Sequence, residues 1–346
     1  MVALDATLAR RLQPGDPGGH LRRALAHFPG RAAAERIVAR YFVPGGLDPA
    51  RPFRPVPRLG LRPSPARTEL IAAANFAEVF LAKEGHHGVV GVNYLEKIQM
   101  ATPAAIYGAM LGGADYILMG AGIPAGIPAL LDVLAGHAPA ELPVTVAGCA
   151  GDRHSVGLEP ASLVDSPVPP VTRPEFLAII SSAVLAEYLC RSDASRPDGF
   201  VLEAPVAGGH SAPPRGRLQV DENGEPVYGP RDDIDLGRVA AHRLPFWLAG
   251  GYSTPQQVNI ARSAGATGVQ VGSPFALCRE SGIDARLKSR LLEQAAADTL
   301  TVRNSTHASP AGLPFKVVQL GRVPWIMGQG LVARCGSTPG RWFPGT

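Results

Sequence analysis

The chain has 346 residues, of which 46% are hydrophobic and 18% charged, a composition that is ordinary for a globular enzyme with a sizeable core. Its net charge of +4 comes almost wholly from arginines that are scattered along the sequence. Because these arginines form no basic stripe interleaved with aromatic residues, we expect no nucleic-acid partner.

Cysteine usage and hydropathy both indicate a cytoplasmic protein. The four cysteines lie far apart with no CxxC pair, which argues against a zinc site or a disulfide framework. The N-terminus lacks an apolar core of signal-peptide length, and no segment has about 18 unbroken apolar residues. We therefore expect no metal, no membrane partner and a cytoplasmic location.

The sequence divides into three parts. Residues 1–68 are predicted to be a helical and Pro/Arg-rich wrapping segment, with one amphipathic helical pattern, GRAAAERIVARYF, at 30–42. Residues 69–320 carry a regular repeat and are predicted to form the main domain. Residues 321–346 contain several Gly and Pro residues without a period, which predicts an irregular tail.

Short strand-forming runs alternate with helical stretches from residue 69 onward. In chain order the runs are ELIAAANF (69–76), VVGVNYL (89–95), YILMGAG (116–122), PVTVAG (143–148), FLAIISS (176–182), DGFVLEAP (198–205), PFWLAGG (245–251) and GVQVGS (268–273). They are apolar on both faces, as are parallel strands that helices cover on both sides. The pattern predicts an α/β fold, a TIM-type (β/α)8 barrel.

Glycines or small polar residues follow several of these runs. They are Asn93, Gly120, Gly122, Gly208, Gly209, Gly250, Gly251, Gly272 and Ser273. In a barrel the carboxyl ends of all the strands share one face, so these residues would converge on one site. A doubly wound sheet would scatter them, which favours the barrel.

The stretch EAPVAGGHSAPPRG, residues 203–216, is typical of a binding loop. Gly208 and Gly209 allow the backbone to approach a ligand, and His210 can move a proton near neutral pH. Two alternatives remain open: a plain Gly-Gly turn, and a histidine that only packs or caps.

The last two units predict a phosphate site. Barrels often bind phosphate through backbone N–H groups in the loops after their last two strands. Gly250 and Gly251 follow one of these runs, and Gly272 and Ser273 follow the next. No GxxxxGK[ST] or GxGxxG motif is present, which disfavours a nucleoside triphosphate and a Rossmann fold.

These motifs resemble a known family. The segment at 74–124, the DGFVLEAPVAGGHSAPPRG segment and the final AGG and GVQVGS units are similar to the nitronate monooxygenase (2-nitropropane dioxygenase) family. They are also similar to the related enoyl reductase subunits of polyunsaturated fatty acid synthases. The resemblance covers roughly residues 5–320 and implies an FMN-binding barrel.

The resemblance also implies roles for individual residues. His210 would be the catalytic residue, and Asn93 would face the flavin. Gly208 and Gly209 would let the chain pass close to the cofactor. The phosphate would be held by Gly250, Gly251, Gly272 and Ser273, and Gln270 would offer a polar contact to the flavin.

Three functions follow from these expectations. The first is an FMN-dependent oxidoreductase that oxidises alkyl nitronates with O2, with a small-molecule substrate. The second is a flavin enoyl reductase that uses NAD(P)H as reductant and acts on thioesters of an acyl carrier protein. The third is a non-catalytic, incomplete barrel. Family members begin with a strand that precedes the segment resembling residues 3–20, so we expect a barrel that lacks its first strand.

Two further motifs have weaker interpretations. The histidines of EGHHG (84–88) point apart on an extended chain and have no carboxylate at ligand spacing, which favours a turn over a metal site. Cys149, Asp152 and His154 lie in one loop without a nucleophile elbow, which favours a loop that shapes the pocket over a catalytic triad.

Overall fold

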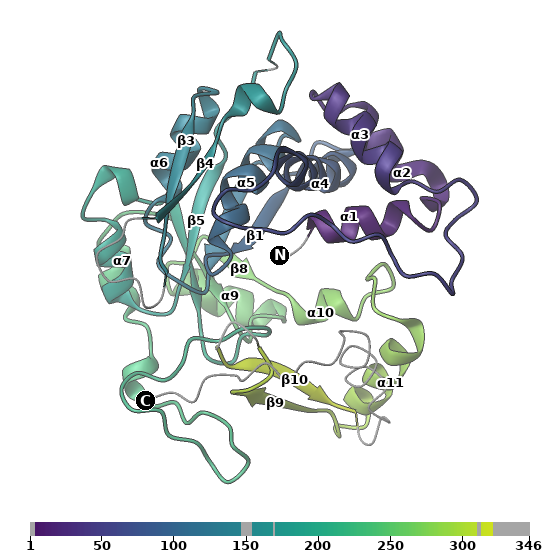
Figure 1. Ribbon diagram of the computed structural model, residues 1–346. Coiled ribbons are helices and arrows are strands. Elements are labelled where there is room, and N and C mark those ends of the chain that lie inside the picture. Colours follow the sequence, from purple (N-terminus) through teal and green to yellow (C-terminus); the bar gives the residue numbers. More distant parts are fainter. Residues whose placement is uncertain (1–3, 147–153, 169, 310–312, 321–346) are drawn as a thin grey trace.

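The computed structural model describes residues 4–146, 154–168, 170–309 and 313–320 (Figure 1). The helices are α1 (Leu4–Leu12), α2 (His20–Ala26), α3 (Arg31–Tyr41), α4 (Pro65–Lys83), α5 (Thr102–Leu111), α6 (Ile127–Ala135), α7 (Ala183–Leu189), α8 (Leu236–Ala240), α9 (Pro255–Ser263), α10 (Ser273–Ala276) and α11 (Ala285–Ala296). The strands are β1 (Gly91–Leu95), β2 (Tyr116–Gly120), β3 (Ala140–Val144), β4 (His154–Leu158), β5 (Glu175–Ile180), β6 (Gly199–Glu203), β7 (Phe246–Ala249), β8 (Gly268–Gln270), β9 (Thr301–Ser305) and β10 (Phe315–Gln319). Among these residues, no helix has the length and apolarity needed to cross a membrane.

The central sheet contains β1, β2, β5, β6, β7 and β8, in that order, and every neighbouring pair is parallel. The spatial order follows the chain order without the reversal that defines a doubly wound sheet. The predicted α/β architecture of the TIM-barrel type is therefore confirmed, with six parallel strands. Within the described ranges, β1 and β8 each pair with one neighbour, so the sheet is an open part of a barrel.

Two of the predicted strands are not in this sheet. The run ELIAAANF at 69–76 lies inside α4, so the strand prediction there is wrong. Helix α4 is capped by Ser64 and begins with Pro65, and it is buried around most of its circumference. A helix that is apolar on all sides has no amphipathic period, so its sequence resembles that of a buried strand.

The run PVTVAG at 143–148 lies only partly in a strand. Its first two residues end β3, which pairs antiparallel with β4 outside the central sheet, and residues 147 and 148 lie outside the described residues. The parallel arrangement expected for this run is therefore wrong. Because an apolar run carries no information about its partner, the sequence does not distinguish a hairpin strand from a barrel strand.

The two faces of the central sheet are packed differently. Alternate side chains such as Ile117, Phe176, Phe200 and Leu248 face the helices and belong to the main core. The opposite face carries a smaller cluster of Leu177, Ile179, Val201 and Ala249, with half-buried Tyr116, Leu118 and Trp247 at its margin. This second face corresponds to the interior of a barrel.

Ion pairs attach the N-terminal helices to α4. Helices α1, α2 and α3 lie beside α4 (Figure 1) and pack against it, and each forms at least one ion pair with α4 or with Glu84, the residue that follows it. The pairs are Asp5–Arg67 and Arg11–Glu78 from α1, Arg23–Glu84 from α2, and Arg36–Glu69 from α3, all at 2.7 Å. The arginines of the wrapping segment therefore serve to dock it. The predicted boundary at residue 69 lies within α4, and the division into three parts stays a prediction.

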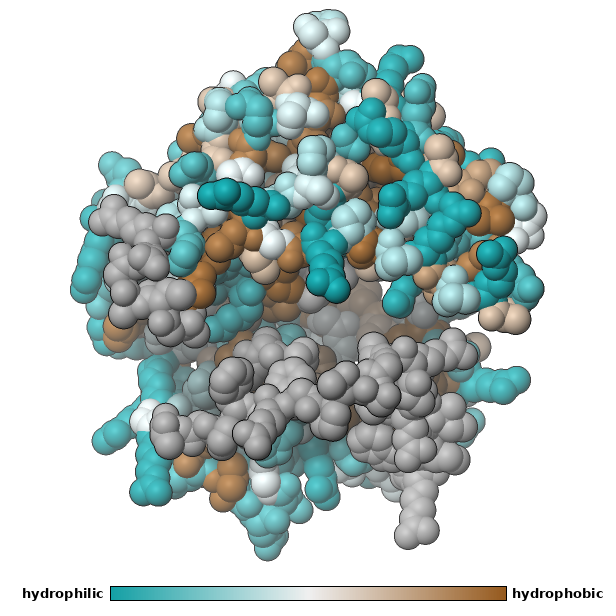
Figure 2. Space-filling view, in the orientation of Figure 1, coloured by the Kyte–Doolittle hydropathy of each residue, from teal (hydrophilic) through white to brown (hydrophobic). Residues whose placement is uncertain are grey.

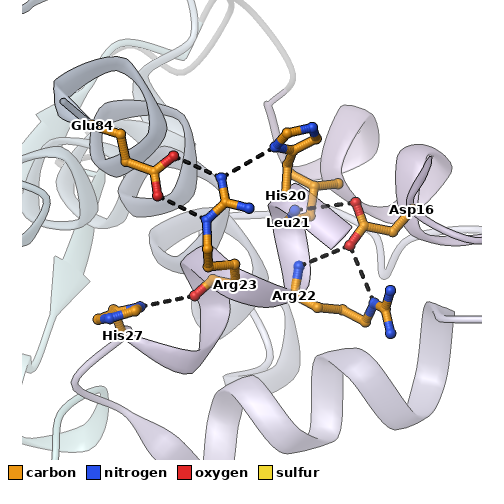
Figure 3. Close-up of polar contacts among 7 residues, drawn as sticks. All are labelled: Asp16, His20, Leu21, Arg22, Arg23, His27 and Glu84. Carbon is orange, nitrogen blue, oxygen red and sulfur yellow. Dashed lines mark hydrogen bonds and ion pairs between the residues drawn. The ribbon is translucent and has the colours of Figure 1, made fainter. Parts of the chain in front are cut away.

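The contact of α2 with the end of α4 is bidentate (Figure 3). Arg23 donates to Glu84 Oε1 and Oε2 at 2.8 and 2.7 Å, and this pairing lowers the pKa of the Glu84 carboxyl. Asp16 accepts hydrogen bonds from the first backbone N–H groups of α2, at Leu21 and Arg22. The fork of the guanidinium matches a carboxylate and fixes the orientation of the helix.

Hydrophilic and apolar residues are mixed on the face of the molecule that Figure 2 shows. Exposed large apolar side chains occur singly on several elements, such as Ile260 on α9 and Leu292 on α11. Single exposed apolar residues are normal on protein surfaces and indicate no function. The candidate functional sites are therefore the cavities at the strand ends.

The packing of α4 against α5 gives a test of the fold. An alanine Cβ at Gly108 would lie 2.1 Å from the Ala72 carbonyl oxygen of α4, whereas one at Gly60 would meet nothing within 4 Å. Alanine normally stabilises a helix relative to glycine, but here the clash dominates. Gly108→Ala should lower the free energy of unfolding by about 1–3 kcal/mol in denaturant titrations. Gly60→Ala should change it by less than about 0.5 kcal/mol, and equal stabilities for the two variants would contradict the packing.

Candidate active site

The largest cavity among those at the strand ends has a volume of about 470 Å³. Its walls come from the carboxyl ends of β6, β7 and β8 and from the loops that follow them. Seven of the nine residues predicted for the site line it: Gly208, Gly209, Gly250, Gly251, Gln270, Gly272 and Ser273. The glycine-rich ends of three consecutive strands therefore converge on one cavity.

Glycine is required at the end of β7. Gly250 and Gly251 have φ values of 102° and 84°, in the left-handed region that residues with a Cβ rarely adopt. A Cβ on Gly250 would also lie 2.9 Å from the backbone nitrogen of Ala207, in the loop after β6. The two loops thus approach each other closely, which draws the end of β6 toward the ends of β7 and β8.

The end of β8 leaves open space at the cavity. A Cβ on Gly272 would meet nothing within 4 Å, and Ser273 Oγ would lie 3.0 Å from a Cβ on Gly208. Ser273 begins α10, and its hydroxyl therefore lies beside the loop that precedes His210. Sequence reasoning missed Tyr252, Ser253 and Pro274, which also line this cavity.

A second cavity, of about 220 Å³, lies on the other side of the β6 loop. His210 lines it, together with Lys97 after β1, Gly122 after β2 and Ser181 after β5. These residues follow four different strands, as expected for the mouth of a barrel. His210 lines this smaller cavity, whereas the phosphate glycines line the larger one.

The loop of His210 is held by β10. Lys316 N–H donates to the Gly209 carbonyl and Ser211 N–H donates to the Pro314 carbonyl, both at 2.9 Å. The His210 ring packs edge-on against Phe315 with centroids 4.8 Å apart, and its Nε2 lies 2.7 Å from Ser309 Oγ. Burial lowers the pKa of His210, which favours the neutral imidazole at pH 7.

Glu203 is a site residue that sequence reasoning missed. It is the last residue of β6, and it lines both cavities. Burial raises the pKa of its carboxyl to about 7, opposed by the positive charge of Lys316. The sequence did contain an indication, because a carboxylate directly ends the otherwise apolar strand GFVLE. Perturbed carboxyl groups in clefts are candidates for functional sites.

Asn93 is not brought to either cavity. It lies in the middle of β1, at the open edge of the sheet, and its side chain is exposed on the barrel-interior face. Its expected contact with a cofactor therefore stays a prediction. The EGHHG turn is confirmed, with Gly88 N–H donating to His86 Nδ1. Of the loop motif, Cys149 and Asp152 lie outside the described residues.

Comparison with known proteins agrees with this geometry. The family model of nitronate monooxygenase matches residues 175–314, the part of the chain that runs from the start of β5 to the residue before β10. Over residues 175–314 the chain is therefore similar to the nitronate monooxygenase family. The matched region contains His210 and every residue that lines the larger cavity.

Curated relatives match over a similar length. A nitronate monooxygenase of Pseudomonas aeruginosa is 31% identical over 143 residues, covering 41% of this chain and 38% of the relative. A probable nitronate monooxygenase of Bacillus subtilis is 33% identical over 121 residues, covering 35% of this chain and 33% of the relative. The chain thus matches little more than a third of the length of these relatives.

Solved structures show a weaker likeness. A FabK variant from Thermotoga maritima has a TM-score of 0.45 at 16% identity and covers 71% of this chain and 61% of its own. The enoyl reductase domain of MlnA from Bacillus amyloliquefaciens has a TM-score of 0.41 at 14% identity. The match covers 72% of this chain and 54% of that domain's chain. The fold is defined by the strand order of the central sheet.

The pKa of Glu203 predicts a pH dependence of stability. Between pH 4.5, its ordinary pKa, and about pH 7, the unfolded chain releases this proton while the folded chain retains it. Rising pH therefore favours unfolding, by up to about 3 kcal/mol. In urea titrations, Glu203→Gln should gain stability relative to the wild type as pH rises through this interval. A stability difference that does not change with pH would contradict the raised pKa.

Proposed function

We propose that this chain is a flavin-dependent oxidoreductase of the nitronate monooxygenase type, which binds FMN in the larger cavity. The observation that carries the proposal is the convergence of seven predicted cofactor residues on one cavity inside the segment that the family model matches. The cavity volume of about 470 Å³ lies in the range of cofactor pockets, about 300–1,000 Å³.

The residues of the cavity fit a phosphorylated, flat cofactor. Gly250, Gly251 and Gly272 offer backbone without side chains in the way, and Ser273 adds a hydroxyl donor. These four residues would hold the phosphate, Gly208 and Gly209 would allow close approach of the chain, and Gln270 would offer its amide. When bound, FMN supplies the redox chemistry, and the protein supplies orientation and proton handling.

His210 is the proposed acid–base residue. A neutral imidazole that lines a cavity of about 220 Å³ can accept the α-proton of a small nitroalkane. Ser309 at Nε2 and Phe315 against the ring would hold the imidazole in one orientation. The substrate proposed for this cavity is a small molecule, an alkyl nitronate or its parent nitroalkane.

The proposed reaction is tested by anaerobic mixing of the FMN-loaded protein with each candidate reductant. An alkyl nitronate alone should bleach the flavin absorbance. Rapid bleaching by NADPH with no response to nitronates would contradict the proposal and favour an enoyl reductase that acts on carrier-bound thioesters. Protein that takes up no FMN would favour a non-catalytic, incomplete barrel.

The phosphate assignment predicts the effect of a single substitution. Gly251→Val places a β-branched side chain at the rim of the cavity, at a φ of 84°. We expect FMN affinity to fall by about 100-fold or more in fluorescence titrations, roughly the loss of two charge-assisted hydrogen bonds. The matched control is Gly224→Val, which strains the backbone similarly at a φ of 76° but lies outside both cavities. Equal affinities for the two variants would contradict the assignment.

The role of His210 is tested by His210→Asn. Loss of a positioned base typically lowers turnover by about 10²- to 10⁴-fold. The variant should keep bound FMN and lose turnover with a neutral nitroalkane, whereas a pre-formed nitronate, which has no α-proton to remove, should lose less. Steady-state kinetics on both substrates measures the difference. Full activity of the variant on both would leave His210 as a packing residue.

A further inference from the structure

Glu203 lies where the two cavities meet. Among the described residues, it alone lines both of them. It ends β6, where its backbone pairs with Ala249 of β7, and the strand continues directly into the loop that carries Gly208 and Gly209. A ligand that fills the larger cavity therefore lies against this residue.

The positive charges around Glu203 do not bring the pKa of its carboxyl back to the ordinary value. The positive charge of Lys316, on β10, lowers the pKa of Glu203. Lys316 also interacts electrostatically with a second carboxylate, that of Glu225. Lys97 and His210 line the smaller cavity beside Glu203. Burial outweighs the attraction of Lys316, and the carboxyl forms no hydrogen bond with the side chains that the structure describes. A half-buried carboxyl without such a partner has its hydrogen-bonding capacity available for a ligand.

We propose that Glu203 is a ligand-positioning residue whose neutral carboxyl donates a hydrogen bond to an acceptor on the flat ring system of a flavin in the larger cavity. The proposal rests on the proposed function, because it assigns the flavin to that cavity. The carbonyl oxygens and unprotonated nitrogens of the ring system are acceptors, so an ionised carboxylate in the same place would repel them. The proposed hydrogen bond therefore requires the protonated form.

The linkage of binding to one proton sets the size of the effect. Because the pKa of Glu203 is about 7, flavin affinity should be constant below that pH and fall about tenfold per pH unit above it. The phosphate of FMN also changes its charge with pH, because its second pKa is about 6. Riboflavin lacks the phosphate and therefore isolates the contact with the ring system.

The experiment is a set of fluorescence titrations with FMN and with riboflavin between about pH 6 and about pH 8.5. The wild type should lose affinity for both ligands above about pH 7. Glu203→Gln should retain binding and show no such loss with riboflavin, because its amide donates a hydrogen bond at every pH. Glu225→Gln is the matched control: Glu225 also acts on Lys316 but lines neither cavity, so this variant should follow the wild type.

A reciprocal measurement covers the case in which Glu203→Gln fails to fold. Infrared spectroscopy of the wild type follows the C=O stretch of the protonated carboxyl as pH rises. Riboflavin should shift the midpoint of its loss upward by about one pH unit or more, because a ligand that prefers one protonation state stabilises that state.

Each outcome decides between the alternatives. Four results would overturn the role of Glu203 while leaving the flavin site intact. They are a flat pH profile in the wild type, the same pH profile in Glu203→Gln as in the wild type, a folded Glu203→Gln that no longer binds flavin at about pH 6, and an infrared midpoint that riboflavin does not shift. Absence of flavin binding by the folded wild type at every pH would overturn the proposed function as well.

Discussion

The geometry of the site depends on one constraint: parallel strands connected in chain order end at the same edge of the sheet. Each βα unit returns the chain to the start of the next strand, so the loops after β6, β7 and β8 lie side by side. Glycines separated by more than sixty residues in sequence, from Gly208 to Gly272, therefore line one cavity. No long-range charge pairing is needed to bring them together.

The segment from β9 to β10 adds a second level of organisation. It pairs with the loop after β6, fixes the His210 ring between Ser309 and Phe315, and brings Lys316 toward the carboxyl of Glu203. The hairpin thus contacts or acts on two of the titratable groups that line the smaller cavity, His210 and Glu203. Burial acts on both in the direction of the neutral form, since it lowers the pKa of His210 and raises that of Glu203.

Six of the eight predicted strand runs lie in the parallel sheet, and the glycine pairs after β6 and β7 line the cavity as expected. The run at 69–76 was misassigned because an Ala-rich helix buried on most sides has no polar face to reveal its period.

Other features depend on tertiary contacts that no local pattern encodes. The raised pKa of Glu203 arises from burial and from Lys316, which lies more than a hundred residues away in sequence. The contact of His210 with Ser309 likewise joins residues from distant segments. Asn93 lines neither cavity because it lies in the middle of β1, whereas Lys97, after the end of the same strand, lines the smaller cavity.

The central claim is that the ends of β6, β7 and β8 form one flavin site, and hydrogen–deuterium exchange of the protein with and without FMN tests it most directly. The account predicts that FMN slows exchange in three separate segments, at 203–209, 249–253 and 270–276, while the helices α1 to α3 are unaffected. Slowed exchange elsewhere, with those three segments unchanged at saturating FMN, would contradict it.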